Sequence, residues 1–151
     1  MEKYAFVVLN LEKFWNRLYN QKRAGKLIHT FVRRGRVGPK NTKQLFFYVT
    51  YPRKEIQGYA DFIGCITGDA EDLWNSLGHE SLLNSYDEYH DFLQGRKNAT
   101  FIRFKNLTEF SKPVNTREIA QIIGKDRMPQ MGMYINKEMA RKLLLKGGII
   151  T

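Results

Sequence analysis

The chain has 151 residues, of which 42% are hydrophobic and 13% aromatic, and its net charge is +10. This apolar content excludes a generally disordered chain, and the length suits one domain with one core. The lone cysteine, Cys65, excludes an internal disulfide and a cysteine-based zinc site. It also favours a reducing compartment, so we expect a cytoplasmic protein. The first apolar run, residues 5–9, is too short for a secretion signal or a membrane span, so we expect no membrane partner.

Charged residues fall into three blocks. Residues 1–54 contain 13 Lys or Arg and 2 Asp or Glu, whereas residues 55–95 contain 9 Asp or Glu and no Lys or Arg. Residues 96–151 return to a basic balance, with 12 Lys or Arg and 4 Asp or Glu. Folding does not require such blocks, so they bear on partners, and a basic excess favours a polyanion. Nucleic acid is therefore the expected partner.

The N-terminal third predicts a strand, a helix and two further strands. Residues 4–9 are apolar and rich in β-branched and aromatic side chains, and Asn10 is expected to cap the helix that follows. Residues 26–34 predict the second strand, which ends in a basic loop containing glycine and proline. Residues 45–49 give the strongest strand pattern, and a proline ends it.

The middle of the chain predicts a long strand and then an acidic helical insert, over about residues 69–95. The strand covers residues 55–67, and Gly58 and Gly64 within it indicate bulges or bends. Asp69 is expected to cap the first helix of the insert, and Ser85 or Asp87 begins the second.

The last third predicts a strand over residues 100–104, then a segment that Pro113 closes, and then a C-terminal helical segment over about residues 115–146. Asn115 with Glu118 forms a capping-box pattern, and Asn136 is expected to cap the final helix. Because strands and helices do not alternate regularly, we expect an α+β fold around a small curved sheet or barrel.

Three stretches resemble one family. Residues 45–52 (LFFYVTYP), 54–60 (KEIQGYA) and 69–74 (DAEDLW) are similar to PUA-like domains, including ASCH and EVE domains, and most to a little-studied archaeal branch. The likeness covers about residues 4–110. It implies one PUA-like domain over residues 1–151, a pseudo-β-barrel with flanking helices and a short helical insert, of a superfamily that commonly binds RNA or modified bases.

The chain departs from the ASCH pattern at the second strand. Such domains usually carry a lysine, then a glutamate, then an arginine there, and Lys26 is followed by no acid at the expected spacing. Some ASCH relatives are ribonucleases or amidohydrolases, and that activity remains the alternative. In it Lys26 is the activated amine or proton shuttle, Thr30 a possible nucleophile and Glu55 the acid or base.

Two groups of cations are the expected phosphate contacts. The first surrounds the loop between the second and third strands, and the second follows the helical insert. Their members are Arg33, Arg34, Arg36, Lys40 and Lys43, and then Arg96, Lys97 and Arg103. The alternative for both groups is an ordinary solvated surface.

Aromatic side chains near cations suit a single-stranded nucleic acid, because bases stack on rings while phosphates meet the charges. Tyr51, Arg53 and Lys54 are the candidates for such contacts. Tyr48 and Trp74 are candidates for a base pocket, although both also suit the core.

The sequence thus predicts an RNA-binding module that contacts phosphates with a basic loop and a base in an aromatic cleft. The RNA could be tRNA, rRNA or another structured or single-stranded RNA. The three histidines have no metal-ligand spacing, so neither a metal nor a cofactor is expected. A protein-interaction adaptor that uses the acidic insert is a further alternative.

Overall fold

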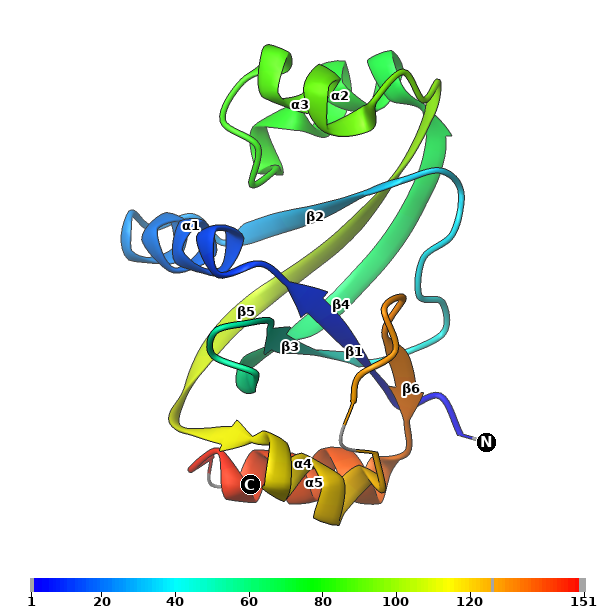
Figure 1. Cartoon of the computed structure of the whole chain (residues 1–151). Coiled ribbons are helices and arrows are strands. Elements are labelled where there is room, and N and C mark those ends of the chain that lie inside the picture. The colour runs from blue at the N-terminus through cyan, green and yellow to red at the C-terminus, as the bar shows by residue number, and fades with distance from the viewer. Residues whose placement is uncertain (1, 126, 150–151) are drawn as a thin grey trace.

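The computed structural model describes residues 2–125 and 127–149, and in this part of the chain it contains six strands, five α-helices and one 3-10 helix (Figure 1). In chain order they are β1 (Ala5–Asn10), α1 (Glu12–Arg23), β2 (Ile28–Arg34), β3 (Gln44–Val49), β4 (Glu55–Asp69), α2 (Ala70–Leu77), η1 (Gly78–Glu80), α3 (Tyr86–Leu93), β5 (Asn98–Asn115), α4 (Thr116–Ile123), β6 (Met133–Ile135) and α5 (Lys137–Lys146).

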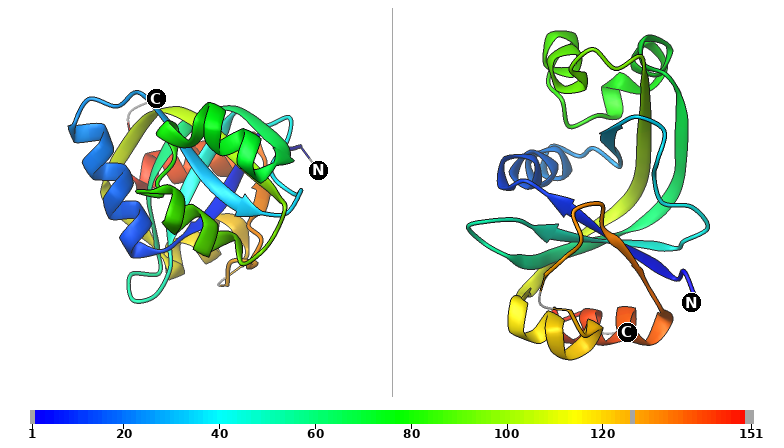
Figure 2. Two further views of the ribbon diagram at one scale, coloured as in Figure 1. Left: turned by 90° about the horizontal axis from the view of Figure 1, so that it is seen from above. Right: turned by 45° about the vertical axis from the view of Figure 1, so that its right-hand side comes forward.

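All six strands form one mixed sheet in the order β2-β5-β4-β3-β1-β6. Only β1 and β3 pair in parallel, and every other pair is antiparallel. The long strands β4 and β5 curve from a helical lobe (α2, η1 and α3) at one end of the molecule to α4 and α5 at the other (Figure 2). The α+β prediction is confirmed, but the sheet does not close, because β2 and β6 are its two edges. The molecule is therefore an open pseudo-barrel.

The bulges predicted in the long strand are confirmed. The β4–β5 register shifts between Ile56 and Gly58 and again between Phe62 and Gly64. A side chain at Gly58 would lie 2.5 Å from the carbonyl oxygen of Thr108 and 2.8 Å from the Trp15 ring. The missing side chain therefore lets α1 pack closely against the sheet at this point.

Apolar side chains cover both faces of the central strands. Along β3, Phe46 belongs to the cluster under α4 and α5, and Phe47 belongs to the cluster under α1 and the helical lobe. Trp15 from α1 packs on Phe47 with ring centroids 5.7 Å apart. Because side chains alternate across a strand, these fully buried rings place helices on both sides of the sheet.

Most predicted helix caps are confirmed. Asp69, Ser85 and Asn136 each accept a hydrogen bond from a backbone N–H in the first turn of α2, α3 and α5. Asn115 and Glu118 form the predicted capping box at α4. Of the two residues expected to begin α3, Ser85 rather than Asp87 is the cap.

Two local predictions are wrong. Asn10 does not cap α1: it is the last residue of β1 and only 1% exposed, and Leu11 occupies the cap position without a side-chain hydrogen bond. The strand expected to end at residue 104 and the segment expected to end at Pro113 are one strand, β5, which continues to Asn115. Between the Gly58–Glu109 pair and the Ile56–Val114 pair the ladder is irregular, so the proline lies where no regular ladder hydrogen bond is lost.

Candidate nucleic-acid interface

The basic loop between β2 and β3 is held against the sheet at several points. The backbone N–H of Lys40 donates to the Tyr134 hydroxyl of β6, at 2.9 Å. The N–H of Lys43 donates to the carbonyl oxygen of Tyr4, at 2.8 Å. These bonds join the loop to the β1–β6 edge, so its lysines extend from a fixed backbone.

A second set of contacts joins the segment after α3 to the start of the loop between β2 and β3. The N–H of Gly35 donates to the carbonyl oxygen of Asn98 at 3.2 Å, and the Arg36 guanidinium donates to the Asn98 side-chain oxygen at 3.3 Å. Arg96 and Lys97 directly precede Asn98 and are exposed. The cations around the β2–β3 loop and those that follow the helical insert therefore lie close together, except for Arg103.

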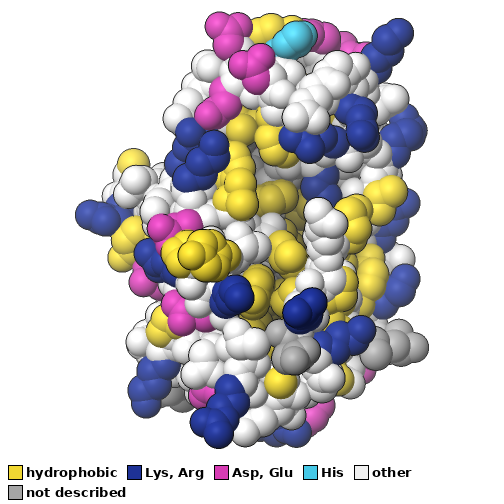
Figure 3. Space-filling model, viewed as in Figure 1, with side chains coloured by type: hydrophobic (Ala, Val, Ile, Leu, Met, Phe, Trp, Pro, Cys, Tyr) yellow, Lys and Arg dark blue, Asp and Glu magenta, His cyan; other side chains and the backbone are white. Residues whose placement is uncertain are grey.

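We call this surface the basic face. Its members are Arg33, Arg34, Arg36, Lys40, Lys43, Arg96 and Lys97. Along the right-hand side of the space-filling view, Lys and Arg side chains border a hollow that contains hydrophobic side chains (Figure 3). Within residues 2–125 and 127–149, none of the seven forms a salt bridge. Their charges are therefore available to a polyanion.

Aromatic rings lie directly beneath two of these cations. The Arg33 guanidinium lies 5.6 Å from the Phe6 ring centroid and donates to the Met131 carbonyl oxygen at 2.8 Å. The Arg34 guanidinium lies 4.8 Å from the ring centroid of Phe92, which is half-buried in α3. Burial lowers the pKa of Arg33, but an arginine so far above neutral pH remains charged. The basic face thus combines fixed cations with apolar rings.

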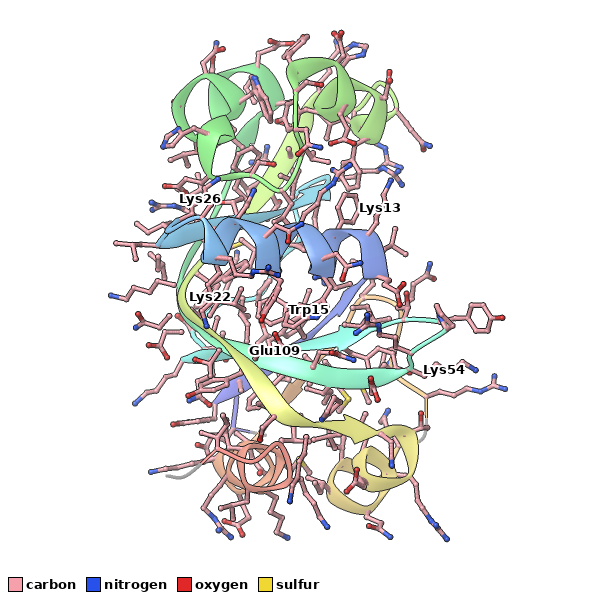
Figure 4. All side chains as sticks on the ribbon, turned by 90° about the vertical axis from the view of Figure 1, so that its left-hand side faces the viewer. Lys13, Trp15, Lys22, Lys26, Lys54 and Glu109 are labelled. Carbon is pink, nitrogen blue, oxygen red and sulfur yellow. The ribbon has the colours of Figure 1, made fainter. Side chains whose placement is uncertain are left out.

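Three other predicted contact residues lie elsewhere. Arg53 and Lys54 belong to the turn between β3 and β4, where Arg53 donates to the Glu12 carboxylate at 2.7 Å. Tyr51 in the same turn is 78% exposed, and the Lys54 ammonium lies 5.9 Å from its ring centroid. In Figure 4, Lys54 lies near the Lys13 end of α1 and Lys26 at the opposite end. The turn follows β3, whereas the basic loop precedes β3, so the two lie at opposite ends of this strand.

The two candidates for a base pocket are packed against other side chains. Tyr48 is 9% exposed and belongs to the cluster under α4 and α5, where burial raises its pKa. Trp74 stacks on Tyr89 with ring centroids 4.6 Å apart. Neither ring therefore lies among the cations of the basic face.

A polar cluster lies between β2, β5 and η1. The Arg103 guanidinium donates to both carboxylate oxygens of Glu80, at 2.8 and 2.9 Å, and the Thr30 hydroxyl donates to one of them at 3.1 Å. Thr30 is fully buried and Glu80 is 6% exposed. The Lys26 ammonium donates to the carbonyl oxygen of His79, next to Glu80. Arg103 thus enters this cluster rather than the basic face.

The environment changes the proton affinity of several groups in this cluster. Hydrogen bonds from Arg103 lower the pKa of Glu80, which stays ionised. Burial lowers the pKa of the Lys26 amine, and burial together with the Lys26 charge lowers that of His29 to about 4. Lys26 also lines an open pocket of about 320 Å³ with Gln21 and Trp74. An amine of lowered pKa beside a pocket can serve as a proton acceptor.

The acid near Lys26 and Thr30 is not the one expected from the sequence. Glu55 pairs with Asn115 at the far end of β5, whereas Thr30 pairs with Arg103 near its start. Glu80, 50 residues after Thr30, occupies the place beside the threonine. No spacing pattern marks it, because the contact depends on the fold: Ser81, directly after η1, forms an isolated parallel bridge with Thr30 and so places Glu80 beside it.

Within the described residues, no group of three or more His, Cys, Asp or Glu side chains is placed to hold a metal ion. Across the same residues, no helix is long and apolar enough to cross a membrane.

No protein-family model matches the chain, but comparison with known proteins finds similar proteins. An ASCH domain-containing ribonuclease from Zymomonas mobilis is 28% identical over 106 residues, which is 70% of each chain. The crystal structure of ASCH from Zymomonas mobilis superposes with a TM-score of 0.77 at 24% identity, covering 95% of this chain and 96% of that one. The structure of its Y47F mutant agrees equally well, with 95% and 98% covered. The sequence match and the shared fold confirm the expected resemblance: the chain has the fold of ASCH proteins and is similar in sequence to one of them.

Proposed function

We propose that the protein binds RNA along the basic face. An RNA-related function is supported by the relative from Zymomonas mobilis that is named a ribonuclease. The observation that carries the proposal is the meeting of two basic segments, more than 50 residues apart in the chain, through hydrogen bonds to Asn98. Such a juxtaposition gives several phosphates of one strand a cation each.

Phosphate contacts should dominate the affinity. The seven cations of the basic face lie on one surface and form no salt bridge within the described residues, so an incoming phosphate need not displace a carboxylate. If about five phosphates of a single strand are neutralised, the logarithm of the affinity falls with the logarithm of salt concentration at a slope near −3.5, from about −0.7 per contact.

The rings beside the cations supply contacts to bases. Phe92 and Phe31 are half-buried and line a small apolar hollow between β2 and α3, with Phe14 of α1 as its third ring. Arg34 lies over Phe92, 4.8 Å from the ring centroid, whereas Arg17, which lies over Phe14, is paired with the Glu88 carboxylate. Bases of a single strand stack on exposed parts of such rings regardless of sequence, while Arg34 meets a flanking phosphate.

The test is fluorescence anisotropy with a labelled single-stranded RNA of mixed sequence, from about 50 to about 200 mM salt. Arg36→Ala should weaken binding and make the salt slope shallower by about 0.7, the value of one lost phosphate contact. Arg53→Ala is the matched control, because this arginine is paired with Glu12 outside the basic face. Affinity independent of salt, or equal losses in the two variants, would refute the proposal.

A second candidate function is RNA cleavage at the cluster of Lys26, Thr30 and Glu80. It is favoured by the lowered pKa of the Lys26 amine beside an open pocket. The lowered pKa enlarges the fraction of Lys26 that is neutral, and a neutral amine can accept the proton of a ribose 2′-hydroxyl as that oxygen attacks the adjacent phosphorus. The 5′-oxygen then leaves and takes a proton from water. Glu80 and Arg103 hold the position of Thr30 in this arrangement.

Cleavage is tested by incubating labelled RNA with the protein and separating the products on a denaturing gel. Lys26→Ala should abolish the products, while Lys22→Ala, an exposed lysine near the end of α1, should leave them unchanged. Products that persist in the Lys26 variant would exclude this role for the amine.

A further inference from the structure

The helical lobe contains a cavity that none of the preceding roles uses. It has a volume of about 220 Å³ and lies between the start of α2, one side of α3 and the turn that leads into β5. This is smaller than the roughly 300–1,000 Å³ of pockets for drug-sized ligands, and so suits one planar ring system better than a large ligand.

The floor of the cavity is apolar and firmly held. Ala70, Tyr89 and Leu93 line it and are buried. The Tyr89 hydroxyl donates to the carbonyl oxygen of Ala70 at 2.6 Å, and the N–H of Ala70 donates to the carbonyl oxygen of Lys97 at 2.8 Å. These bonds connect α2, α3 and the turn before β5, so the cavity is defined before any ligand enters.

The rim carries charges of both signs. Arg96 and Lys97 stand on it together with Asp69 and Glu71, yet within the described residues these cations form no salt bridge with the carboxylates. A simple anion would be repelled by the carboxylates and a simple cation by Arg96 and Lys97. The rim therefore favours a ligand that presents a negative group on one side and hydrogen-bond donors on the other.

Each rim carboxylate retains one free acceptor. One oxygen of Asp69 accepts from the backbone N–H of Asp72 at 3.0 Å, and one oxygen of Glu71 accepts from the Tyr86 hydroxyl. The second oxygen of each has no hydrogen-bond partner in the part of the chain that the structure describes. The cavity thus offers two acceptors, and the exposed ring of Tyr86 stands beside them.

We propose that this cavity binds a guanine base of the RNA. The inference rests on the proposed function, because Arg96 and Lys97 belong to both the cavity rim and the basic face. Guanine presents two adjacent donors, N1–H and the 2-amino group, on an edge that is accessible in a single strand. Adenine and cytosine present one amino group on that edge, and uracil presents one N–H. The two carboxylate acceptors therefore favour guanine, while its phosphate meets the two cations.

The experiment compares oligouridine strands that carry one central guanosine, inosine or adenosine, by competition anisotropy. The protein should prefer guanosine to adenosine by about tenfold, a value within the range for paired base contacts. Inosine, which lacks the 2-amino group, should fall between the two. The combined variant Asp69→Asn, Glu71→Gln should lose the preference and retain its affinity for plain oligouridine.

These substitutions preserve the fold, because asparagine caps a helix as well as aspartate does and glutamine still accepts from Tyr86. Asp87→Asn is the matched control, since Asp87 is exposed in α3 and lies outside the cavity lining. Binding of all strands without a base preference, or a preference that survives the double variant, overturns the guanine assignment and leaves RNA binding standing. Failure to bind any strand overturns both.

Discussion

Glu80 is the residue whose removal should affect stability most clearly. Its carboxylate accepts two hydrogen bonds from Arg103 and one from Thr30, which joins η1 to β5 and β2. Glu80→Gln keeps the size of the side chain and one oxygen for Thr30, but removes the negative charge opposite Arg103. The substitution therefore tests the ion pair rather than the packing.

The expected cost follows from burial. Removing one partner of a buried ion pair costs about 3–5 kcal/mol, because the other charge is left without compensation. The Arg103 side chain is 23% exposed, so water recovers part of this cost. We expect Glu80→Gln to lower the free energy of unfolding by about 2–3 kcal/mol, and the melting temperature by about 4–12 °C for a chain of this length.

Urea unfolding at pH 7 measures this change, and a double-mutant cycle with Arg103→Met isolates the pair. Because the pKa of Glu80 is lowered in the folded protein, its stabilisation is complete above the unfolded-state value of about 4.3. That stabilisation is lost as the pH falls further, through the folded-state pKa. Glu80→Gln should flatten this acid dependence. A loss below about 0.5 kcal/mol, or a coupling free energy near zero, would refute the reasoning.

Three further predictions concern the fold. Gly58→Ala should destabilise the protein by about 1–3 kcal/mol in urea, because the added carbon would strike the Trp15 ring and a backbone oxygen, whereas Gly64→Ala, which meets nothing within 4 Å, should be far milder. The His29 ring should titrate near pH 4 by NMR, and its contribution to stability should be complete above about pH 6.5 and decline as the pH falls toward 4, by up to about 1.4 kcal/mol per pH unit. A ring that titrates near 6.5 would contradict this. Asn115→Ala should cost about 1 kcal/mol of stability by removing the α4 cap, and an unchanged unfolding midpoint would argue against that cap.

Local features of the chain were predictable because their causes are local. The glycines in β4 marked two of the three register shifts between β4 and β5, and Asp69 and Asn115 marked helix starts, since each acts on backbone within a few residues. The same reasoning failed at Asn10, where β1 continues for one more residue. Its pairing with Val49 of β3 outweighs the local preference of asparagine for a cap.

The α+β class, the approximate positions of the strands and helices, and the separation of charge into blocks could all be predicted from the order of the amino acids. Which charged groups meet became clear from the folded structure. It joined Arg36 to Asn98, paired Arg53 with Glu12, and placed Glu80 rather than Glu55 beside Thr30. These partners lie 41 to 62 residues apart in the chain, so their contacts depend on how curved strands and an inserted lobe pack. The spacing of residues along the chain does not reveal these contacts, because each of them forms only when all the strands of the sheet are paired in the correct register.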